Sequence, residues 1–126
     1  MPSPDDRKYL DSHEWHKAEG DLVVIGLSQF AVDELADVTY VEFIKDSGSV
    51  TAGETFGEIE SVKATSELYC GIDGEIVETN QQVIDNPAMV NEDPFGDAWL
   101  IKVKPANAGD LEKLLSGPDY DNKVGA

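Results

Sequence analysis

The chain of 126 residues contains one cysteine and no long run of apolar residues. A single cysteine cannot form a disulfide within the chain, and no basic neighbour would stabilise a thiolate, so we expect Cys70 to be a small core residue. No apolar run approaches the roughly 20 residues of a membrane-spanning helix. Residues 1–6 lack the basic and apolar regions of a secretion signal and are too acidic for a transit peptide. The sequence therefore predicts a cytoplasmic protein.

Cations are also scarce, since 9 Lys and Arg residues stand against 26 Asp and Glu residues, for a formal net charge of −17. A surface this negative repels phosphates, so we expect neither nucleic acid nor a membrane as a partner. It favours proteins with basic patches, although solubility or adaptation to salt would produce the same excess. The length predicts one domain over residues 1–126, with a flexible lead-in over 1–8 and a flexible tail over 119–126.

Motifs of catalysis are missing as well. The sequence has no Gly-rich phosphate loop and no nucleophile elbow. His13 and His16 lie three apart in an extended segment, where side chains point to opposite faces, so joint chelation of a metal ion is disfavoured. Carboxylates are too numerous for any pair to stand out as general acid and base. We therefore predict no metal site and no catalysis by the chain alone.

Short strand-like runs separated by turn residues predict a compact, mainly β fold. In the run 38–44 apolar residues occupy both alternation sets, so we expect both faces of this strand to be covered. The run 98–104 alternates like a half-buried strand that ends at Pro105. Gly-Glu-Ile-Glu at 57–60 recurs as Gly-Glu-Ile-Val-Glu at 74–78. Unless it arises by chance, this echo indicates two similar β units packed face to face.

Two segments have helical spacing. Ser28 can cap a helix over 29–36, and a second helix over 108–116 would end at Gly117-Pro118. Turn residues through 80–97 predict a mostly irregular segment. These helices would brace the sheets, since neither carries an obvious active group.

Lys63 is the only cation between Asp46 and Ile101, a stretch with twelve Asp and Glu residues. The pattern that follows it predicts a strand leaving a turn, with Lys63 near the tip, where a modifying enzyme could reach its amine. A solvated lysine paired with nearby carboxylates is the better interpretation from composition alone. A catalytic lysine is disfavoured, because exposure and carboxylates both favour the charged form.

Several motifs occur together in a fixed order. They are Ser12-His13-Glu14-Trp15, Val24-Ile25-Gly26-Leu27, 31–35, Val41-Glu42, 60–64, 74–78, Val90-Asn91 and Trp99-Leu100-Ile101-Lys102. In this order and spacing they resemble the glycine cleavage system H-protein family, over about Tyr9 to Tyr120. A series of ordered motifs is far more specific than any one of them, and it reverses the interpretation of Lys63.

The resemblance implies a lipoyl carrier, with lipoate attached to Lys63 by an amide. It implies a flattened barrel-sandwich hybrid of two antiparallel sheets, as in lipoyl- and biotinyl-carrier domains, with short flanking helices including a C-terminal one. Such a carrier takes an aminomethyl group from a pyridoxal-phosphate glycine decarboxylase to a tetrahydrofolate-dependent aminomethyltransferase. An FAD-dependent dihydrolipoyl dehydrogenase then reoxidises the dithiol. A lipoate ligase or octanoyltransferase would load a monomeric carrier.

By the same resemblance, one group of residues should form a cleft for the arm: Ser12, Glu14, Leu27, Glu34, Leu35 and Glu67. Glu14 or Glu67 could hold the arm's ammonium, and Glu60 and Glu67 could guide recognition by the ligase. The chain departs from the family in three places, one of which is Asp37-Val38-Thr39-Tyr40, where Asp-Ile-Val-Phe is common. It has Gly71-Ile72-Asp73-Gly74 where Pro-x-Ser-Gly is usual, and Ala36 where Gly is common.

Other functions stay open at this point. One is an H-like lipoyl carrier that acts in lipoate relay or outside glycine catabolism, which the sequence does not separate from the main interpretation. Another is an unmodified acidic interaction module that keeps only the fold. Biotin carriers share the fold but place Met on both sides of the target lysine, where this chain has Val62 and Ala64.

Overall fold

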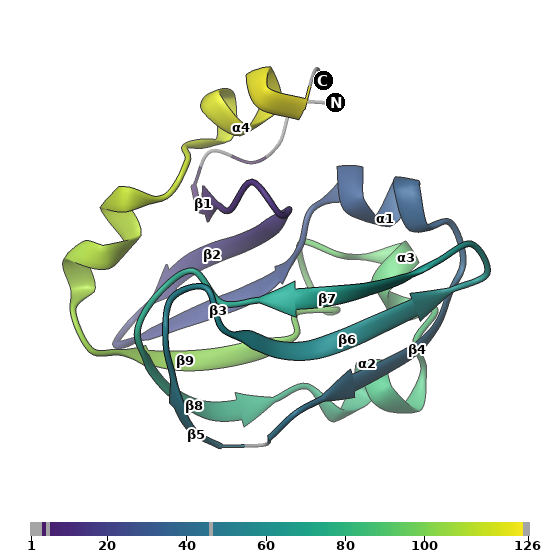
Figure 1. The fold of residues 1–126 in the computed structure, drawn as a ribbon, viewed down its shortest axis with the longest axis horizontal. Coiled ribbons are helices and arrows are strands. Elements are labelled where there is room, and N and C mark those ends of the chain that lie inside the picture. The colour runs from purple at the N-terminus through teal and green to yellow at the C-terminus, as the bar shows by residue number, and fades with distance from the viewer. Residues whose placement is uncertain (1–3, 5, 46, 125–126) are drawn as a thin grey trace.

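The computed structural model describes residue 4 and residues 6–45 and 47–124. Two antiparallel sheets pack face to face, and short helices surround them (Figure 1). The six-stranded sheet has the order β1-β2-β3-β9-β8-β5, and the three-stranded sheet has the order β4-β6-β7. Neither sheet closes into a barrel. The expected mainly β sandwich with short flanking helices is confirmed.

The strands are β1 (Lys8–Tyr9), β2 (Glu14–Glu19), β3 (Leu22–Leu27), β4 (Val38–Phe43), β5 (Gly48–Val50), β6 (Thr55–Ser61), β7 (Thr65–Tyr69), β8 (Gly74–Thr79) and β9 (Ile101–Pro105). The helices are α1 (Gln29–Leu35), α2 (Gln81–Asp85), α3 (Met89–Glu92), a 3₁₀ helix (Ala108–Lys113) and α4 (Gly117–Val124). As predicted, Ser28 caps α1, its Oγ accepting a hydrogen bond from the Ala31 N–H. Segment 80–97, expected to be irregular, contains α2 and α3, each only one turn long.

The core has two parts. The larger part fills the space between the two sheets and includes Cys70, which is buried as expected. Burial raises the pKa of its thiol to about 11, against a smaller opposing effect of its hydrogen bond to the Ile72 carbonyl. The smaller part lies on the other side of the six-stranded sheet and is made of Tyr9, Trp15, Val24 and Tyr120.

The repeated sequence has a structural counterpart. Gly57 in β6 and Gly74 in β8 lie in different sheets, yet each faces a backbone carbonyl of a neighbouring strand so closely that a Cβ would clash with it. Two residues later, Ile59 and Ile76 are both completely buried. The echo therefore marks two strands with the same packing, one in each of the facing sheets.

One prediction about β4 is wrong. The strand lies at the edge of the three-stranded sheet, and Thr39, Tyr40 and Glu42 on it are exposed. Its register against β6 shifts between Val38 and Tyr40. This irregularity explains why apolar residues occur in both alternation sets, because it places Val38 and Val41 on the same buried face.

The C-terminal predictions also need correction. The predicted helix over 108–116 is a 3₁₀ helix ending at Lys113, and Gly117-Pro118 begins α4 where a stop was expected. Proline is tolerated in the first turn of a helix, where its missing N–H has no helical partner. The tail predicted over 119–126 is helical as far as Val124, and Tyr120 within it is completely buried. Residues 125–126 lie outside the described part.

At the other end, the predicted lead-in over 1–8 is partly integrated into the fold. Lys8 pairs with His16 in the sheet, and the Arg7 guanidinium lies 4.6 Å from the Trp15 ring centroid. Residues 1–3 and 5 of this segment lie outside the described part. Within the ranges that are described, no helix is both long and apolar enough to span a bilayer.

Candidate functional site

Lys63 lies in the turn between β6 and β7, as the sequence predicts, and its side chain is exposed. The turn is held by Ser61, whose Oγ accepts hydrogen bonds from the backbone N–H groups of Lys63 and Ala64, both at 3.1 Å. The Ser61 N–H in turn donates to the Ala64 carbonyl at 2.8 Å. A single serine thus fixes the backbone that presents the lysine.

The turn also touches the segment after α1. The Val62 N–H donates to the Asp37 carbonyl at 3.1 Å. On both sides of Asp37 the backbone is held by Asn91 of α3, which donates to the Ala36 carbonyl at 2.5 Å and accepts from the Val38 N–H at 2.8 Å. Asn91 belongs to one of the family motifs, but no local pattern predicts its contact with residues more than fifty positions away.

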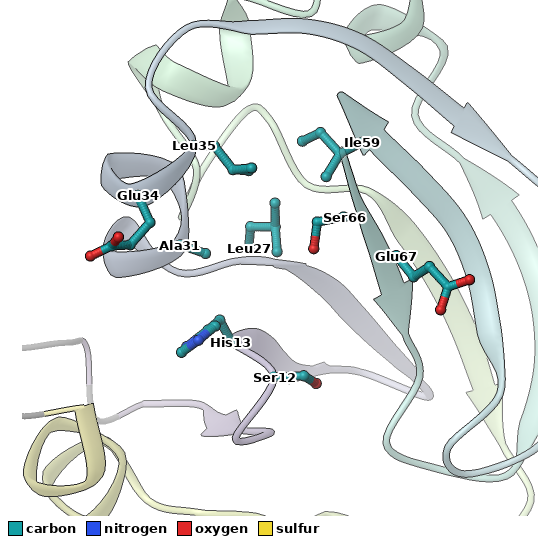
Figure 2. A pocket seen from close by; sticks show the side chains of 9 residues that line it. All are labelled: Ser12, His13, Leu27, Ala31, Glu34, Leu35, Ile59, Ser66 and Glu67. Carbon is teal, nitrogen blue, oxygen red and sulfur yellow. The ribbon is translucent and has the colours of Figure 1, made fainter. Parts of the chain in front are cut away.

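A small pocket of about 120 Å³ opens between α1, the β1–β2 loop and the β6–β7 hairpin (Figure 2). Its apolar part comes from Leu27 at the end of β3, Ala31 and Leu35 of α1, and Ile59 of β6. Polar groups from three elements complete it: Ser12, His13, Glu34, Ser66 and Glu67. The pocket therefore combines an apolar floor with a polar rim.

Five of the six predicted cleft residues line this pocket: Ser12, Leu27, Glu34, Leu35 and Glu67. In Figure 2 the carboxylates of Glu34 and Glu67 point away from the middle of the pocket, whereas Ser66 points into it. The prediction missed four lining residues, which are His13, Ala31, Ile59 and Ser66. Ser66 could have been found from the alternation along β7, because residues i and i+2 share a face.

Glu14, the sixth predicted residue, does not line the pocket, because it is completely buried. Its carboxylate accepts hydrogen bonds from the Ser12 hydroxyl at 2.5 Å and from the Tyr69 N–H at 2.8 Å. Burial raises its pKa to about 7, and these two hydrogen bonds oppose the rise. Glu14 thus holds Ser12 of the pocket lining and the end of β7 without reaching the pocket itself, which the sequence could not reveal.

His13 sits at the rim in a left-handed backbone conformation, with φ +86°. Its Nδ1 is 2.7 Å from the hydroxyl of Tyr120 in α4, and its ring contacts that of Phe30 at 5.0 Å between centroids. Burial lowers its pKa, although Asp11 and Glu34 partly offset this. The hydroxyl of Tyr120 is also 2.6 Å from Ser28 Oγ, so the C-terminal helix reaches the pocket wall.

His16 belongs to a different environment. It is completely buried, and its Nε2 accepts a hydrogen bond from the Gly71 N–H at 2.9 Å. A proline at position 71, which the resemblance leads us to expect, would have no N–H to donate, so this contact requires the glycine found here. Burial lowers the pKa of His16 to about 4. Among the residues with described positions, no cluster of three or more His, Cys, Asp or Glu could hold a metal ion.

Carboxylates flank the Lys63 turn on one face of the three-stranded sheet. Glu58 pairs with Glu42 on one side and with Glu67 on the other, and Glu60 pairs with Tyr40 and Thr65. Like charges directly opposite one another destabilise a sheet. Glu60 and Glu67, which the sequence proposed for ligase recognition, lie on this acidic face.

The chain matches the glycine cleavage H-protein family over residues 7–125. It is 46% identical to a glycine cleavage system H protein of Bordetella pertussis over 125 residues, covering 99% of this chain and all of that protein. An H protein of Acinetobacter baumannii is 46% identical over 121 residues, which cover 96% of this chain and 98% of the relative.

The fold gives the same result. The crystal structure of a glycine cleavage system H protein from Mycobacterium marinum superposes with a TM-score of 0.88 at 36% identity, covering 98% of this chain and 99% of that one. Sequence, fold and nearly complete coverage agree. The chain belongs to the glycine cleavage H-protein family.

Proposed function

We propose that Lys63 is the attachment point of a lipoyl group, joined by an amide to its ε-amine, and that the adjacent pocket receives the end of this arm. Family membership makes the chain a lipoyl carrier of the glycine cleavage system, which does not itself catalyse the reactions. The observation that carries the assignment of Lys63 is its exposed position at the turn from which β7 runs to the pocket wall.

The Lys63 amine is accessible to a modifying enzyme. Within residues 6–45 and 47–124, Lys63 forms no ion pair, although carboxylates are abundant around it. This speaks against the interpretation of Lys63 as an ion-paired surface lysine. Because Ser61 fixes the backbone of the turn, the side chain is presented at a defined place while remaining free to move.

The pocket suits the end of a lipoyl arm. Ser66 and Glu67 lie three and four residues beyond Lys63, roughly 10–13 Å along the strand, which a long flexible arm can span. When bound, a lipoyl group supplies a disulfide that accepts an aminomethyl group and leaves a dithiol for reoxidation. The apolar floor formed by residues such as Leu27 and Leu35 would cover the end of the arm and exclude water, which slows hydrolysis.

Ser12 would bind an ammonium group in the pocket. Its hydroxyl proton is donated to Glu14, so its oxygen lone pairs are available to accept a hydrogen bond. The negative charge of ionised Glu14 behind Ser12 strengthens that acceptor. Glu14 is therefore proposed as the residue that orients and polarises Ser12, in place of the direct ammonium contact expected from the sequence.

The specific partners are part of the proposal. They are a pyridoxal-phosphate glycine decarboxylase, a tetrahydrofolate-dependent aminomethyltransferase, an FAD-dependent dihydrolipoyl dehydrogenase, and a lipoate ligase or octanoyltransferase. A tethered arm raises the effective concentration of its reactive end at each docked partner. The net charge of −17 favours basic docking surfaces, and Glu60 and Glu67 beside Lys63 would guide the ligase. A cytoplasmic location and a monomeric state stay predictions of the sequence.

Mass spectrometry tests the assignment directly. The purified chain is incubated with a lipoate ligase, ATP and lipoate, and peptide mapping locates the adduct. We expect one lipoyl group, on Lys63. An adduct on another lysine, or none, would refute the site, and none even in protein from the native host would favour the unmodified acidic module.

A second experiment separates glycine cleavage from lipoate relay. The lipoylated protein is combined with the three enzymes of the system, tetrahydrofolate and NAD. We expect NADH formation that depends on both glycine and the carrier. Lipoylation without glycine-dependent NADH formation, together with transfer of the lipoyl group to other acceptor proteins, would assign the chain to lipoate relay.

A further inference from the structure

The hydroxyl of Tyr120 lies between the two walls of the pocket. It is 2.7 Å from Nδ1 of His13, which lines the pocket directly, and 2.6 Å from Oγ of Ser28. Ser28 is the N-cap of α1, and α1 contributes Ala31, Glu34 and Leu35 to the opposite wall. One hydroxyl group from α4 is therefore in contact with the supports of both walls.

The three groups form a chain in which the two hydroxyls of Ser28 and Tyr120 can each donate to the next group. Ser28 Oγ accepts from the Ala31 N–H at 3.3 Å, and its own proton can go to the Tyr120 oxygen. The Tyr120 hydroxyl then donates to Nδ1 of His13, which requires a neutral imidazole with its proton on Nε2. Burial favours the neutral imidazole of His13 and the protonated hydroxyl of Tyr120, because it lowers the pKa of His13 and raises that of Tyr120 to about 12.

His13 needs such support. Its φ of +86° is a conformation that side chains other than glycine rarely adopt, and it persists only when surrounding contacts hold it. The backbone supplies part of the support, because the Ser28 N–H donates to the His13 carbonyl at 2.9 Å. That bond fixes the backbone and leaves the ring free to rotate. Phe30 packs against the ring, and the Tyr120 hydroxyl forms the hydrogen bond that determines which ring nitrogen faces α4.

We propose that Tyr120 is a positioning residue of the pocket: its hydroxyl orients His13 and supports the start of α1, so that the C-terminal helix sets the shape of the space that receives the arm. This inference rests on the proposed function for the role of the pocket, whereas the hydrogen-bond arrangement itself does not. Tyr120 is completely buried and its ring stacks on that of Tyr9 at 4.7 Å, so it is held rigidly enough for this task.

The test uses Tyr120→Phe, which keeps the stacked ring and removes only the hydroxyl. The first measurement is ¹⁵N NMR of the His13 ring in the protein without lipoate. In the wild type we expect the tautomer protonated at Nε2, and in the variant a mixture of both tautomers. The second uses lipoylated protein that has been charged from glycine by a decarboxylase and then separated from it. Ammonia release should be roughly fivefold faster in the variant, as expected for the loss of one hydrogen bond.

Tyr9→Phe is the matched control, because the Tyr9 hydroxyl donates to the Pro4 carbonyl, away from the pocket. This variant should leave the His13 tautomer and the rate of ammonia release as in the wild type. An unchanged tautomer in Tyr120→Phe, or equal acceleration of ammonia release in both variants, would overturn the proposal. If the wild type takes up no lipoate, the proposed function fails, while the tautomer still decides whether Tyr120 orients His13.

Discussion

The turn that carries Lys63 and the pocket beside it are held by different kinds of contact. In the turn, Ser61 bonds to backbone groups two and three residues away. Around the pocket, the bond from the Tyr69 N–H to Glu14 spans 55 residues, and the one between His13 and Tyr120 spans 107. The turn is therefore encoded locally, whereas the pocket exists only after distant parts of the chain have met.

The two regions also differ in their exposure to water. Lys63 and its neighbours are exposed, while Glu14, Ser28 and Tyr120 around the pocket are completely buried. An enzyme that modifies Lys63 needs access to it, and a pocket that protects a labile group needs fixed polar groups away from solvent. Substitutions in the turn should thus change modification, and substitutions around the pocket should change stability and retention of the arm.

The largest expected effect is that of Lys63→Arg. Arginine keeps the positive charge but offers no amine that can form the lipoyl amide, so we expect complete loss of lipoylation and of glycine-dependent NADH formation. Because the side chain is exposed, the free energy of unfolding should stay within about 0.5 kcal/mol of the wild type. Intact mass and urea unfolding measure the two quantities.

Lys104→Arg is the control for this substitution, since Lys104 is an exposed lysine on β9. It should be lipoylated at the wild-type rate. Glycine-dependent turnover retained by Lys63→Arg would show that the arm is attached elsewhere, and a large loss of stability would show that the turn is not independent of the fold.

The second largest effect concerns Glu14 and pH. Its pKa is raised to about 7 in the folded protein, so the folded state binds more protons than the unfolded state between about pH 4.5 and 7. The contribution of Glu14 to stability is therefore greatest at low pH and is lost as the pH rises through 7. His16 has the opposite effect, because its lowered pKa makes stability rise with pH between about 4 and 6.5.

Glu14→Gln isolates the first effect, because His16 is present in both proteins and cancels in their difference. From pH 4 to pH 8 the variant should gain about 3 kcal/mol of unfolding free energy relative to the wild type. Urea unfolding at each pH measures this. A difference for Glu14→Gln that does not change with pH would mean that the carboxylate titrates normally.

The same comparison explains what the sequence could predict. The Lys63 turn and the Ser28 cap depend on neighbours in the chain, and both were predicted correctly, whereas the strand expected over 98–104 begins only at Ile101. The ordered family motifs predicted the two-sheet sandwich and five of the residues that line the pocket. Glu14 was wrongly expected to line the pocket. The family motif contains Glu14, but a motif does not reveal that Ser12 lies between the Glu14 carboxylate and the pocket.

The prediction for the C-terminal segment was wrong for a related reason. Gly117-Pro118 is a usual helix stop, and a short polar segment after it is typical of a flexible tail. The segment is nevertheless ordered as α4, because Tyr120 stacks on Tyr9 at the other end of the chain and forms a hydrogen bond with Ser28. No local pattern contains that information, because the contact exists only in the assembled fold.

Asn91→Ala removes contacts between distant residues, and Ser61→Ala removes contacts within the Lys63 turn, so the two variants test the two kinds of contact separately. Asn91→Ala leaves the Val38 N–H and the Ala36 carbonyl without their partners, so we expect a loss of about 2 kcal/mol in unfolding free energy. Lipoylation of the folded protein should change less than about threefold, because Ser61 still holds the turn. Ser61→Ala should do the reverse, with slower lipoylation and a smaller loss of stability.

Urea unfolding and the kcat/KM of a lipoate ligase measure these effects. Asn91→Asp is the intermediate variant, because its carboxylate still accepts from the Val38 N–H but cannot donate to the Ala36 carbonyl. It should lose less stability than Asn91→Ala. If Asn91→Ala slowed the ligase as much as Ser61→Ala, the turn would depend on the distant clamp and the distinction between the two regions would fail.

The smallest effect is a gain in stability where the two regions meet. Ala36, at the end of α1, has φ +62° and ψ −137°, a conformation that glycine adopts far more readily than alanine. Ala36→Gly removes the strain but increases the freedom of the unfolded chain, so we expect a net gain of about 1 kcal/mol. Ala31→Gly, inside α1, should instead destabilise by about 1 kcal/mol. Urea unfolding compares them, and a loss of stability in Ala36→Gly would contradict the strain, leaving alanine as well suited to this junction as the glycine common in the family.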